Sequence, residues 1–509
     1  MKIPGISFTI SEDTCSDLKQ RIDSFTFKPH VYKYGVVTKV SDGVTRIAEL
    51  SGRCYGELLE FSNGVFGMVM DLEEDGVGAV ILNSGDTVSV GDTVRGTGHT
   101  IDVPVGDCVL GRVLDPIGKP LDGKPLIAAE YYPVERKAPP IIDRSPVNRP
   151  LETGILAIDS MIPIGRGQRE LIIGDRQTGK TTIALDTILN QKGKNVLCIY
   201  CAIGQKASNI AQTVQKLKDT GAMEYSMVVA STASDSAAMQ YLAPYAACSI
   251  AEFFMEKGRD VLVVYDDLSK HAIAYRTMSL LLHRPPGREA YPGDVFYLHS
   301  RLLERSAQLS QELGGGSMTA LPIIETMGGN ISAYIPTNVI SITDGQIYLE
   351  SELFHSGIRP AVNTGLSVSR VGRSAQHPAM RAVSGSLRIE LAQYREMAVF
   401  ARFGSDIDES TKELLARGEC LTYLLNQRKG ATYSLAQEVT LLLAFQESAL
   451  KGIDISRLPQ AIVSLLDFIH KNASSTEIEI NTSGMLTDEV RQQLKEALLQ
   501  WSKEYGKSE

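Results

Sequence analysis

The chain reads Gly174-Asp-Arg-Gln-Thr-Gly-Lys-Thr181 between an apolar run and an amphipathic stretch. This octapeptide fits the pattern G-x-x-x-x-G-K-[ST], that of a P-loop, at every fixed position. The apolar run before it is Leu171-Ile-Ile173, and the stretch after it, Thr181 to Gln191, has its apolar residues on one helical face. Because a P-loop joins a strand to a helix, the sequence predicts a phosphate-binding turn inside an α/β domain.

The residue types of this loop suit a nucleotide phosphate chain. Gly174 and Gly179 allow main-chain N–H groups to turn inward around the phosphates. Lys180 supplies a positive charge for the β and γ phosphates, and the Thr181 hydroxyl is a ligand type for Mg²⁺. The positive end of the following helix adds to the attraction. The loop residues that we expect to bind the nucleotide are Gly174, Asp175, Arg176, Gln177, Thr178, Gly179, Lys180 and Thr181.

An acidic group is expected at the end of a neighbouring strand, because a P-loop needs one for its Mg²⁺. The apolar run Val261 to Tyr265 ends at Asp266-Asp267. Ligands of open α/β sheets bind at the carboxyl ends of the strands. Asp266 comes first after the run, so it and Thr181 are the predicted metal ligands. Two acids after a strand are often only a solvated turn, and that alternative stays open at this point.

The α/β pattern extends on both sides of the loop, with strands alternating with helices from about Ile101 to Gly372. Nearly continuous apolar strands separated by helices predict a parallel sheet that is covered on both faces. We assign residues 99–374 to this domain. The other apolar runs that we expect to be strands are Val196 to Ala202 and Met227 to Ala230.

The flanking regions have different patterns. Short β-branched runs alternate with turn signals such as Asp42-Gly43 and Asn63-Gly64, which predicts a small β-barrel or sandwich over residues 28–98. Residues 375–509 show almost no strand signal and are expected to be all α, with an amphipathic last segment from Leu486 to Trp501. Residues 1–27 are expected to form a lead with one short helix, around Cys15 to Ile22.

The composition is that of a globular protein of several domains: 509 residues, 43% hydrophobic and 22% charged. A formal net charge of -9 argues against a broad nucleic-acid surface. The seven cysteines have no framework spacing. Cys198 and Cys201 read C-x-x-C but fall in a predicted buried strand, where residues three apart point to opposite faces. The first residues show no signal peptide, and no run is long enough to span a bilayer.

Several long motifs are similar to the α/β subunit family of F-type ATP synthases. The resemblance covers most of the chain from about Tyr34 to the start of the helical region. It implies a six-stranded β-barrel, a central RecA-like P-loop domain and an all-α C-terminal domain, with ATP or ADP and Mg²⁺ as ligands. The motifs that carry it are Asp266-Asp-Leu-Ser-Lys-His-Ala-Ile-Ala-Tyr275, Arg284-Pro-Pro-Gly-Arg-Glu-Ala-Tyr-Pro-Gly-Asp294, Val295 to Arg305, Ile335-Pro-Thr-Asn-Val-Ile-Ser-Ile-Thr-Asp-Gly345 and Pro360-Ala-Val-Asn-Thr-Gly-Leu-Ser-Val-Ser369.

Two features resemble the non-catalytic α chains of that family more than the catalytic β chains. The loop GDRQTGKT is less rich in glycine than the loop of β chains. Gln205 matches the position of a glutamate that activates the attacking water in β chains, and an amide cannot accept a proton near neutral pH. The resemblance therefore implies a chain that binds Mg-nucleotide and regulates but does not turn it over well.

The resemblance also implies an adenine pocket, in which Phe354 can stack the base and Arg359 can stack or hold a loop. Three features depart from the family pattern: Lys429 stands where α chains usually offer a polar amide, Arg373 stands where small residues are preferred, and the N-terminal lead is unusual. The implied pocket residues are Arg176, Gln177, Phe354, Arg359, Pro360 and Gln427.

Arg370 directly follows the family signature and is the implied catalytic residue, an arginine finger that acts in trans on a β chain. The implied partners are β chains in an alternating ring of three α and three β, a central-stalk γ chain, and peripheral-stalk δ and b chains. The implied location is the cytoplasmic face of the cell membrane, with membrane contact only through the complex. Other chains determine whether H⁺ or Na⁺ is transported.

Three alternatives compete with this interpretation. The first is a catalytic β chain or a related ring ATPase. The second is a nucleic-acid motor such as a transcription-termination helicase, which would need interleaved aromatic and basic residues in the barrel. Residues 65–110 are acidic and glycine-rich instead. The third is a nucleotide-binding regulator that acts alone.

Overall fold

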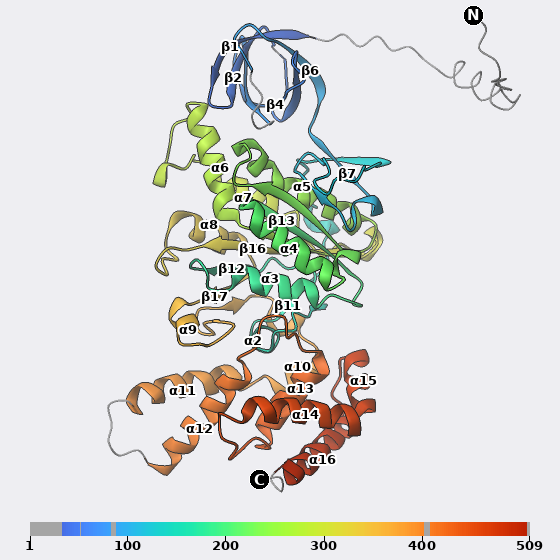
Figure 1. Cartoon of the computed structure of the whole chain (residues 1–509), viewed down its shortest axis with the longest axis vertical. Coiled ribbons are helices and arrows are strands. Elements are labelled where there is room, and N and C mark those ends of the chain that lie inside the picture. Colours follow the sequence, from blue (N-terminus) through green and yellow to red (C-terminus); the bar gives the residue numbers. More distant parts are fainter. Residues whose placement is uncertain (1–32, 51, 83–87, 402–407, 506–509) are drawn as a thin grey trace, which may run out of the picture.

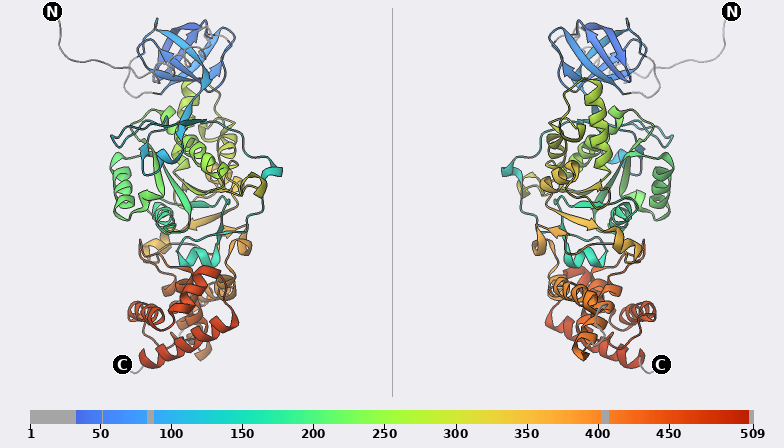
Figure 2. Two further views of the ribbon diagram at one scale, coloured as in Figure 1. Left: turned by 90° about the vertical axis from the view of Figure 1, so that its right-hand side faces the viewer. Right: turned by 90° about the vertical axis from the view of Figure 1, so that its left-hand side faces the viewer.

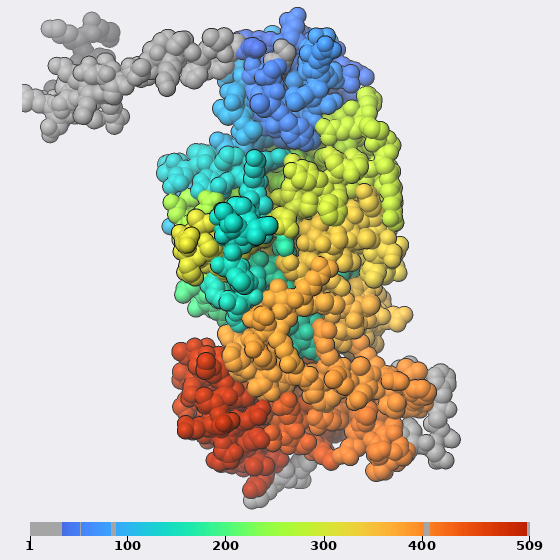
Figure 3. Space-filling model, turned by 180° about the vertical axis from the view of Figure 1, so that it is seen from behind, coloured from blue at the N-terminus to red at the C-terminus, as the bar shows by residue number. Residues whose placement is uncertain are grey.

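The computed structural model describes residues 33–50, 52–82, 88–401 and 408–505, and the helix expected around Cys15 to Ile22 lies outside them. Three parts follow one another along the long axis of the molecule (Figures 1 and 2). The β-barrel lies at one end, the α/β domain in the middle and the helical domain at the other end. Figure 3 shows the same order on the opposite face. The three-part fold class predicted from the sequence is thereby confirmed.

The N-terminal part is a closed six-stranded barrel in the order β1-β2-β5-β4-β3-β6. The expected turn pairs lie between strands: Asp42-Gly43 joins β1 to β2, and Asn63-Gly64 joins β3 to β4. Asp42 and Gly43 have φ of 41° and 83°, the left-handed region that these residues tolerate. The strands are β1 (Tyr34–Ser41), β2 (Val44–Ala48), β3 (Glu57–Phe61), β4 (Phe66–Leu72), β5 (Gly76–Ile81) and β6 (Thr93–Thr100).

The central part contains an eight-stranded sheet in the order β18-β17-β12-β16-β15-β13-β14-β8. Every pair in it is parallel except β17 with β18 at one edge. The strands are β8 (Val113–Leu114), β12 (Leu171–Gly174), β13 (Val196–Gln205), β14 (Ser226–Thr232), β15 (Asp260–Asp266), β16 (Ser317–Glu325), β17 (Gly345–Leu349) and β18 (Val368–Ser369).

Helices cover both faces of this sheet, so its strands are apolar on both sides. Alternate residues of β12 enter different cores: Ile172 packs in one cluster, and Leu171 and Ile173 pack in the other. This is the two-sided burial that continuous apolar runs predict. The helices are α2 (Leu156–Met161), α3 (Lys180–Leu189), α4 (Ala207–Asp219), α5 (Ala237–Glu256), α6 (Leu268–Leu281), α7 (Val295–Leu303), α8 (Tyr334–Ile342) and α9 (Ser351–His355).

Two sequence expectations about this domain need correction. The alternation of strands and helices begins at α2 and not near Ile101. The preceding segment has short strands and 3₁₀ turns, because its prolines and glycines interrupt any helix; the strands are β7 (Asp102–Val105), β8, β9 (Glu130–Pro133) and β10 (Pro150–Leu151), which pairs with β11 (Ile164–Gly165). The strand that ends at Asp266 is also not the neighbour of β12, since β16 lies between them.

The C-terminal part is helical, as predicted, and packs under the α/β domain. Its helix α13 is buried along almost its whole length, and its core is continuous with one face of the sheet. No helix in the described part of the chain is long and apolar enough to span a bilayer. The helices are α10 (Pro378–Val383), α11 (Leu387–Ala401), α12 (Glu409–Leu424), α13 (Leu435–Gln446), α14 (Leu458–Asn472), α15 (Ser474–Ser483) and α16 (Asp488–Tyr505).

Candidate nucleotide-binding site

The loop at Gly174–Lys180 joins the end of β12 to the start of α3, as the sequence predicts. Steric constraints explain why both fixed positions of the loop are glycine. A Cβ on Gly174 would lie 2.6 Å from the carbonyl oxygen of Leu349 on the adjacent strand. Gly179 precedes α3 with φ of 102°, a conformation that side chains disfavour. The loop therefore turns tightly, with main-chain groups facing the start of the helix.

Asp175 holds this loop against two other segments. Its Oδ1 accepts hydrogen bonds from Thr326 Oγ1 (2.7 Å) and Gly329 N (2.9 Å), and its Oδ2 accepts one from Ser351 Oγ (3.0 Å). Burial opposes ionisation of this carboxyl, but these hydrogen bonds keep its pKa below the ordinary value. The Thr178 hydroxyl donates to the Asp175 carbonyl at 2.9 Å. These contacts fix the shape of the loop.

Lys180 begins α3 and has only 6% of its surface exposed. Its ammonium donates to the main-chain carbonyl of Gly174 at 2.9 Å and to that of Asp175. Burial lowers its pKa from the ordinary value, and surrounding carboxylates oppose the shift; they are Glu325, Asp267, Asp266 and Asp175. The group is a partly desolvated cation beside the loop, suited to an anionic phosphate.

Asp266 and Thr181 meet at the carboxyl end of the sheet. The Thr181 hydroxyl donates to Asp266 Oδ2 at 2.8 Å, and the Tyr200 hydroxyl donates to the same oxygen at 2.8 Å. Asp266 is 4% exposed, so it is not a solvated turn. One hydroxyl and one carboxylate are the oxygen donors with which a P-loop protein holds Mg²⁺ alongside phosphate and water. The residues present therefore fit that ion.

Gln205 is buried at the end of β13 beside this acid. Its Nε2 donates to the Asp266 carbonyl at 3.0 Å and to the Tyr200 hydroxyl at 3.2 Å. The amide is thus held beside the acid of the predicted metal pair. An amide is not a base near neutral pH, so Gln205 cannot accept a proton.

A cavity of about 210 Å³ lies beside the loop, between α3 and the helical domain. It contains Thr178 and Gly179 together with Phe354, Arg359, Pro360 and Gln427 of the predicted set. The Arg359 guanidinium carbon lies 4.8 Å from the centre of the Phe354 ring. The cavity is thus walled by an aromatic ring and a cation, which suits a flat base.

Two predicted pocket residues, Arg176 and Gln177, do not line this cavity. The Arg176 side chain is 74% exposed and pairs with Glu325 at 3.1 Å. The sequence interpretation missed several lining residues. Those on α3 follow one face of the predicted helix and could have been inferred from its period, whereas the others come from distant segments. The missed residues are Ile155, Thr182, Ile183, Asp186, Ala361 and Arg428.

The Gln427 side chain joins the helical domain to the α/β domain. Its Oε1 accepts from Leu156 N at 3.1 Å, and its Nε2 donates to the carbonyls of Gly154 (2.7 Å) and Ala431. It thus forms one wall of the cavity while bonding to main-chain groups. A contact of this amide with a base stays a prediction. Lys429, which departs from the family pattern, also lines the cavity and is exposed.

Arg370 lies away from the loop, at the other end of the strands. Gly174 pairs with Leu349, which ends β17, whereas Ser369 pairs with Gly345, which begins β17. Arg370 follows Ser369, and its main-chain N–H donates to the Asp344 carbonyl at 2.8 Å. Its side chain is exposed and makes no hydrogen bond or ion pair with the residues that the structure describes.

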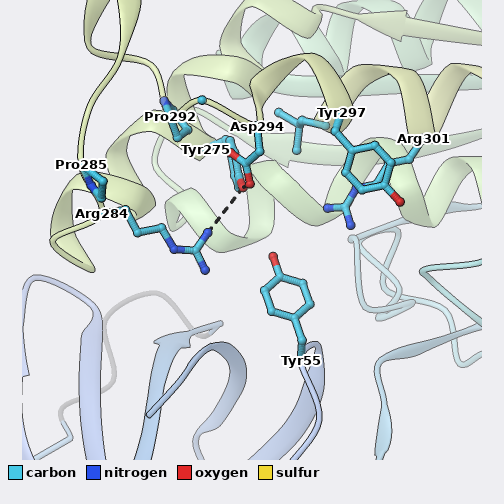
Figure 4. A pocket seen from close by; sticks show the side chains of 10 residues that line it. Tyr55, Tyr275, Arg284, Pro285, Pro292, Asp294, Tyr297 and Arg301 are labelled. Atoms are coloured by element: carbon cyan, nitrogen blue, oxygen red, sulfur yellow. Dashed lines mark hydrogen bonds between the residues drawn. The ribbon is translucent and has the colours of Figure 1, made fainter.

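A larger cavity of about 570 Å³ lies between the barrel and the α/β domain (Figure 4). Tyr55 of the barrel faces Arg284 and Tyr275 across it, and Arg301 lies at its other side. The Tyr275 hydroxyl donates to Asp294 at 2.6 Å, and Arg301 is bonded to Glu135 and two tyrosines. No residue of the P-loop or of the metal pair lines this cavity, so it is separate from the nucleotide site.

The cysteine pair belongs to the core, as predicted. Cys198 and Cys201 lie in β13 and are fully buried, and burial raises the pKa of both thiols. Within the described ranges, no group of three or more histidine, cysteine or acidic residues is arranged to hold a metal ion.

Comparisons with known proteins match this architecture part by part. The barrel, residues 31–98, matches the ATP synthase alpha/beta family, beta-barrel domain. Residues 154–369 match the nucleotide-binding domain of the same family, and residues 376–501 match the C terminal domain of the ATP synthase alpha/beta chain. The chain belongs to the ATP synthase alpha/beta family.

Several curated members of the ATP synthase alpha/beta family resemble the chain over nearly its whole length. ATP synthase subunit alpha of Acetivibrio thermocellus is 58% identical over 97% of this chain and 98% of its own length. The proteins of the same name from Caldanaerobacter subterraneus and Clostridium acetobutylicum are 57% and 56% identical, each over 97% of this chain and 98% of their own. Membership of the ATP synthase alpha/beta family disfavours the helicase alternative.

Proposed function

We propose that this chain is the regulatory, non-catalytic α subunit of an F-type ATP synthase. It binds Mg-ATP or Mg-ADP at its own P-loop, and it supplies Arg370 to the catalytic site of a neighbouring β subunit. The relatives described above, each named ATP synthase subunit alpha, support the first part. The position of Arg370 relative to the P-loop supports the second.

The position of Arg370 is the observation that carries the proposal. Ser369 pairs with Gly345 at the start of β17, and Gly345 comes four residues before Leu349, which pairs with Gly174 at the end of β12. Arg370 follows Ser369 in the antiparallel β18 and is therefore level with Asp344, five residues before Leu349. At about 3.3 Å per residue, this places Arg370 roughly 16 Å along the strands from the chain's own loop, and two strands away from it. An exposed guanidinium there suits a phosphate of the next subunit and not the phosphate of its own site.

The chemistry of an arginine explains why a non-catalytic subunit would be required. Phosphoryl transfer develops negative charge on the oxygens of the γ phosphate. A guanidinium presents two N–H groups in a fixed fork and can meet two such oxygens. A finger of this kind is worth about 10³–10⁵ in rate when a neighbouring chain supplies it.

The chain's own site is suited to binding but not to turnover. Thr181 and Asp266 would hold Mg²⁺, which when bound neutralises part of the phosphate charge. Lys180 would bind the β and γ phosphates, and Phe354 would stack on the base. Gln205 orients groups through its amide but cannot take a proton from an attacking water. These residues together retain the nucleotide without activating the water.

The remaining parts of the proposal concern assembly. Three copies of this chain would alternate with three β subunits around a central γ subunit, with δ and b subunits in the peripheral stalk. The ring would couple ion flow to ATP synthesis or hydrolysis as an H⁺- or Na⁺-transporting two-sector ATPase. It would lie at the cytoplasmic face of the cell membrane and contact the membrane only through the complex.

The experiment that tests the proposal is Arg370→Lys in the assembled ring. Lysine keeps the charge but loses the fork, so we expect nucleotide to remain bound at the β sites while multisite turnover falls at least about 100-fold. Arg373→Lys, three residues away and also exposed, is the matched control and should leave turnover within about twofold. Near-normal turnover in an intact Arg370→Lys ring would rule the role out.

A further inference from the structure

The cavity beside the P-loop is where the base of a bound nucleotide would lie. Thr178 and Gly179 of the loop line it, so a nucleotide whose phosphates lie on the loop has its base in this cavity. Phe354, on helix α9 next to the helical domain (Figure 1), provides an aromatic ring in its wall. Stacking on such a ring holds any base, because every base has a π face. A preference between bases must therefore come from polar groups that meet the edge of the base.

Several acceptors on the wall of this cavity already hold donors of the protein. The Gln427 Oε1 accepts from Leu156 N, and its Nε2 donates to two carbonyls. The main-chain carbonyls of Arg359, Pro360 and Ala361 accept from main-chain N–H groups at 2.6, 2.8 and 3.0 Å. These acceptors are committed to the fold, so they offer little to the amino group of adenine, which is a donor.

Asp186, the acidic residue that lines the cavity, is committed to the fold as well. It is 5% exposed, and its Oδ1 accepts from Lys216 Nζ at 3.0 Å. Its Oδ2 accepts from Gly430 N at 3.0 Å, which ties the segment after Gln427 to helix α3. Lys429 lies between Gln427 and Gly430, so bonds on both sides hold its main chain at the cavity that it lines.

The charged side chains that remain free at this cavity are cations. Lys429 and Arg428 line it, are exposed, and make no hydrogen bond or ion pair within the part of the chain that the structure describes. The Arg359 guanidinium lies 4.8 Å from the centre of the Phe354 ring, so it is placed at a ring face. Ammonium and guanidinium groups donate hydrogen bonds and accept none. The free charged groups therefore suit a base edge that presents acceptors.

Guanine and adenine differ in this respect. Guanine presents two adjacent acceptors, O6 and N7, whereas adenine presents N7 beside an amino group that donates. A lysine can donate to both acceptors of guanine, but opposite adenine it sets one donor against another. The ammonium of Lys429 is thus better matched to guanine than to adenine.

We propose that Lys429 determines the base preference of this site and that the site binds guanine nucleotides at least as tightly as adenine nucleotides. This inference rests on the proposed binding of nucleotides at the P-loop, and it extends the ligands to purine nucleotides that carry a keto oxygen at position 6. Lys180 and the loop hold the phosphates, Phe354 stacks on the base, and Lys429 donates to O6 and N7.

The test is calorimetric titration of the full chain with Mg-GTP and with Mg-ATP. For the unmodified chain, we expect the Kd for Mg-GTP to equal or lie below the Kd for Mg-ATP. Lys429→Gln should raise the ratio of the GTP Kd to the ATP Kd at least about tenfold, because an amide both donates and accepts and so matches N7 and the amino group of adenine. Lys429→Arg keeps the donors and should leave the ratio within about threefold.

Two analogues of the base test which edge Lys429 meets. Inosine triphosphate keeps O6 and N7 but lacks the 2-amino group of guanine, so its Kd should lie within about threefold of that for GTP. 7-Deaza-GTP lacks the N7 acceptor and should bind at least about threefold more weakly than GTP. Strong binding of GTP with binding of inosine triphosphate at least about tenfold weaker would show that the 2-amino group is recognised instead, and would overturn the role of Lys429.

Lys192→Gln is the matched control, since it removes the same charge from an exposed lysine beyond the end of α3. It should leave the ratio within about twofold. A shift as large as that of Lys429→Gln would show that net charge alone matters and would overturn the inference.

The remaining outcomes separate the inference from the proposed function. Binding of Mg-ATP more than about tenfold tighter than that of Mg-GTP by the unmodified chain would overturn the inference while leaving nucleotide binding at the P-loop intact. An unchanged ratio in Lys429→Gln would do the same. Binding of neither nucleotide to the folded chain would instead contradict the proposed function itself.

Discussion

The Thr181 hydroxyl donates a hydrogen bond to the Asp266 carboxylate at 2.8 Å, although 85 residues separate them in the chain. Thr181 belongs to the first turn of α3, and Asp266 ends β15, which lies two strands away from β12. The two oxygen donors are therefore brought together by the order of strands in the sheet. Their contact defines where a magnesium ion would lie, and it can be tested by mutation.

Asp266→Asn should weaken the binding of Mg-nucleotide about 10- to 100-fold. The amide can still accept from Thr181 and Tyr200, so the fold is preserved, but the negative charge that favours Mg²⁺ is lost. Binding should be measured by calorimetry with Mg²⁺ and again with a chelator, where the two proteins should differ by less than about threefold. Equal weakening under both conditions would argue against a metal-binding role.

Lys180→Ala should weaken nucleotide binding at least about tenfold, because the phosphates lose a cation in a partly desolvated site. Lys192→Ala, an exposed lysine beyond the end of α3, is the matched control for loss of one positive charge and should change affinity by less than about twofold. The unmodified chain by itself should hydrolyse ATP far more slowly than about 1 s⁻¹. A fluorescent-nucleotide titration measures the affinity, and a phosphate-release assay measures the rate of hydrolysis.

Gln205→Glu should not create an active hydrolase. The substitution replaces the donated hydrogen bonds to Tyr200 and the Asp266 carbonyl with a buried carboxyl next to an acid. We expect a loss of about 1–3 kcal/mol in stability and weaker binding of Mg-nucleotide, with turnover of the lone chain still below about 1 s⁻¹. Thermal unfolding measures the change in stability, and a hydrolysis assay measures the turnover of the lone chain. Turnover typical of an enzyme would show that residue 205 alone separates a non-catalytic from a catalytic subunit.

Stability should fall as pH rises from about 4 to above 6, through a carboxyl pair between the α/β and helical domains. Burial raises the pKa of Asp159 to about 6, and it raises that of Glu438 well above the ordinary value; the two are joined by a side-chain hydrogen bond. Raised folded-state pKa values stabilise the folded protein below the unfolded value near 4, and this contribution is lost as the pair ionises. The change is on the order of 2–3 kcal/mol.

Glu438→Gln should flatten this dependence, because the amide needs no proton. The charged groups around the pair are Glu152 and Lys194 from the α/β domain, with His377 bonded to Glu152 at 2.9 Å. Thermal unfolding of the full chain at pH 5, 6 and 8 measures the effect. If the unmodified protein and Glu438→Gln lose stability in parallel, the carboxyl pair is not the cause.

The sequence determined the features that depend on residues close together in the chain. The period of the apolar side chains predicts the strand that ends at Asp266 and the helix after the P-loop. Glycine or asparagine at tight turns predicts the P-loop and the turns of the barrel. These patterns act over a few residues, so they can be recognised without knowing what packs against them. Residues 375–509 were likewise identified as helical from the lack of strand signals.

Only the tertiary structure decided which of these segments meet. The insertion of β16 between β12 and β15 depends on long-range strand pairing, which leaves no local pattern. The placement of Arg370 at the start of the strands, away from Lys180, depends on the antiparallel pairing of β18 with β17. The close approach of the Glu170 carboxyl to Gly345 depends on the register of β17 against β12, because a shift of one residue would turn each side chain to the other face.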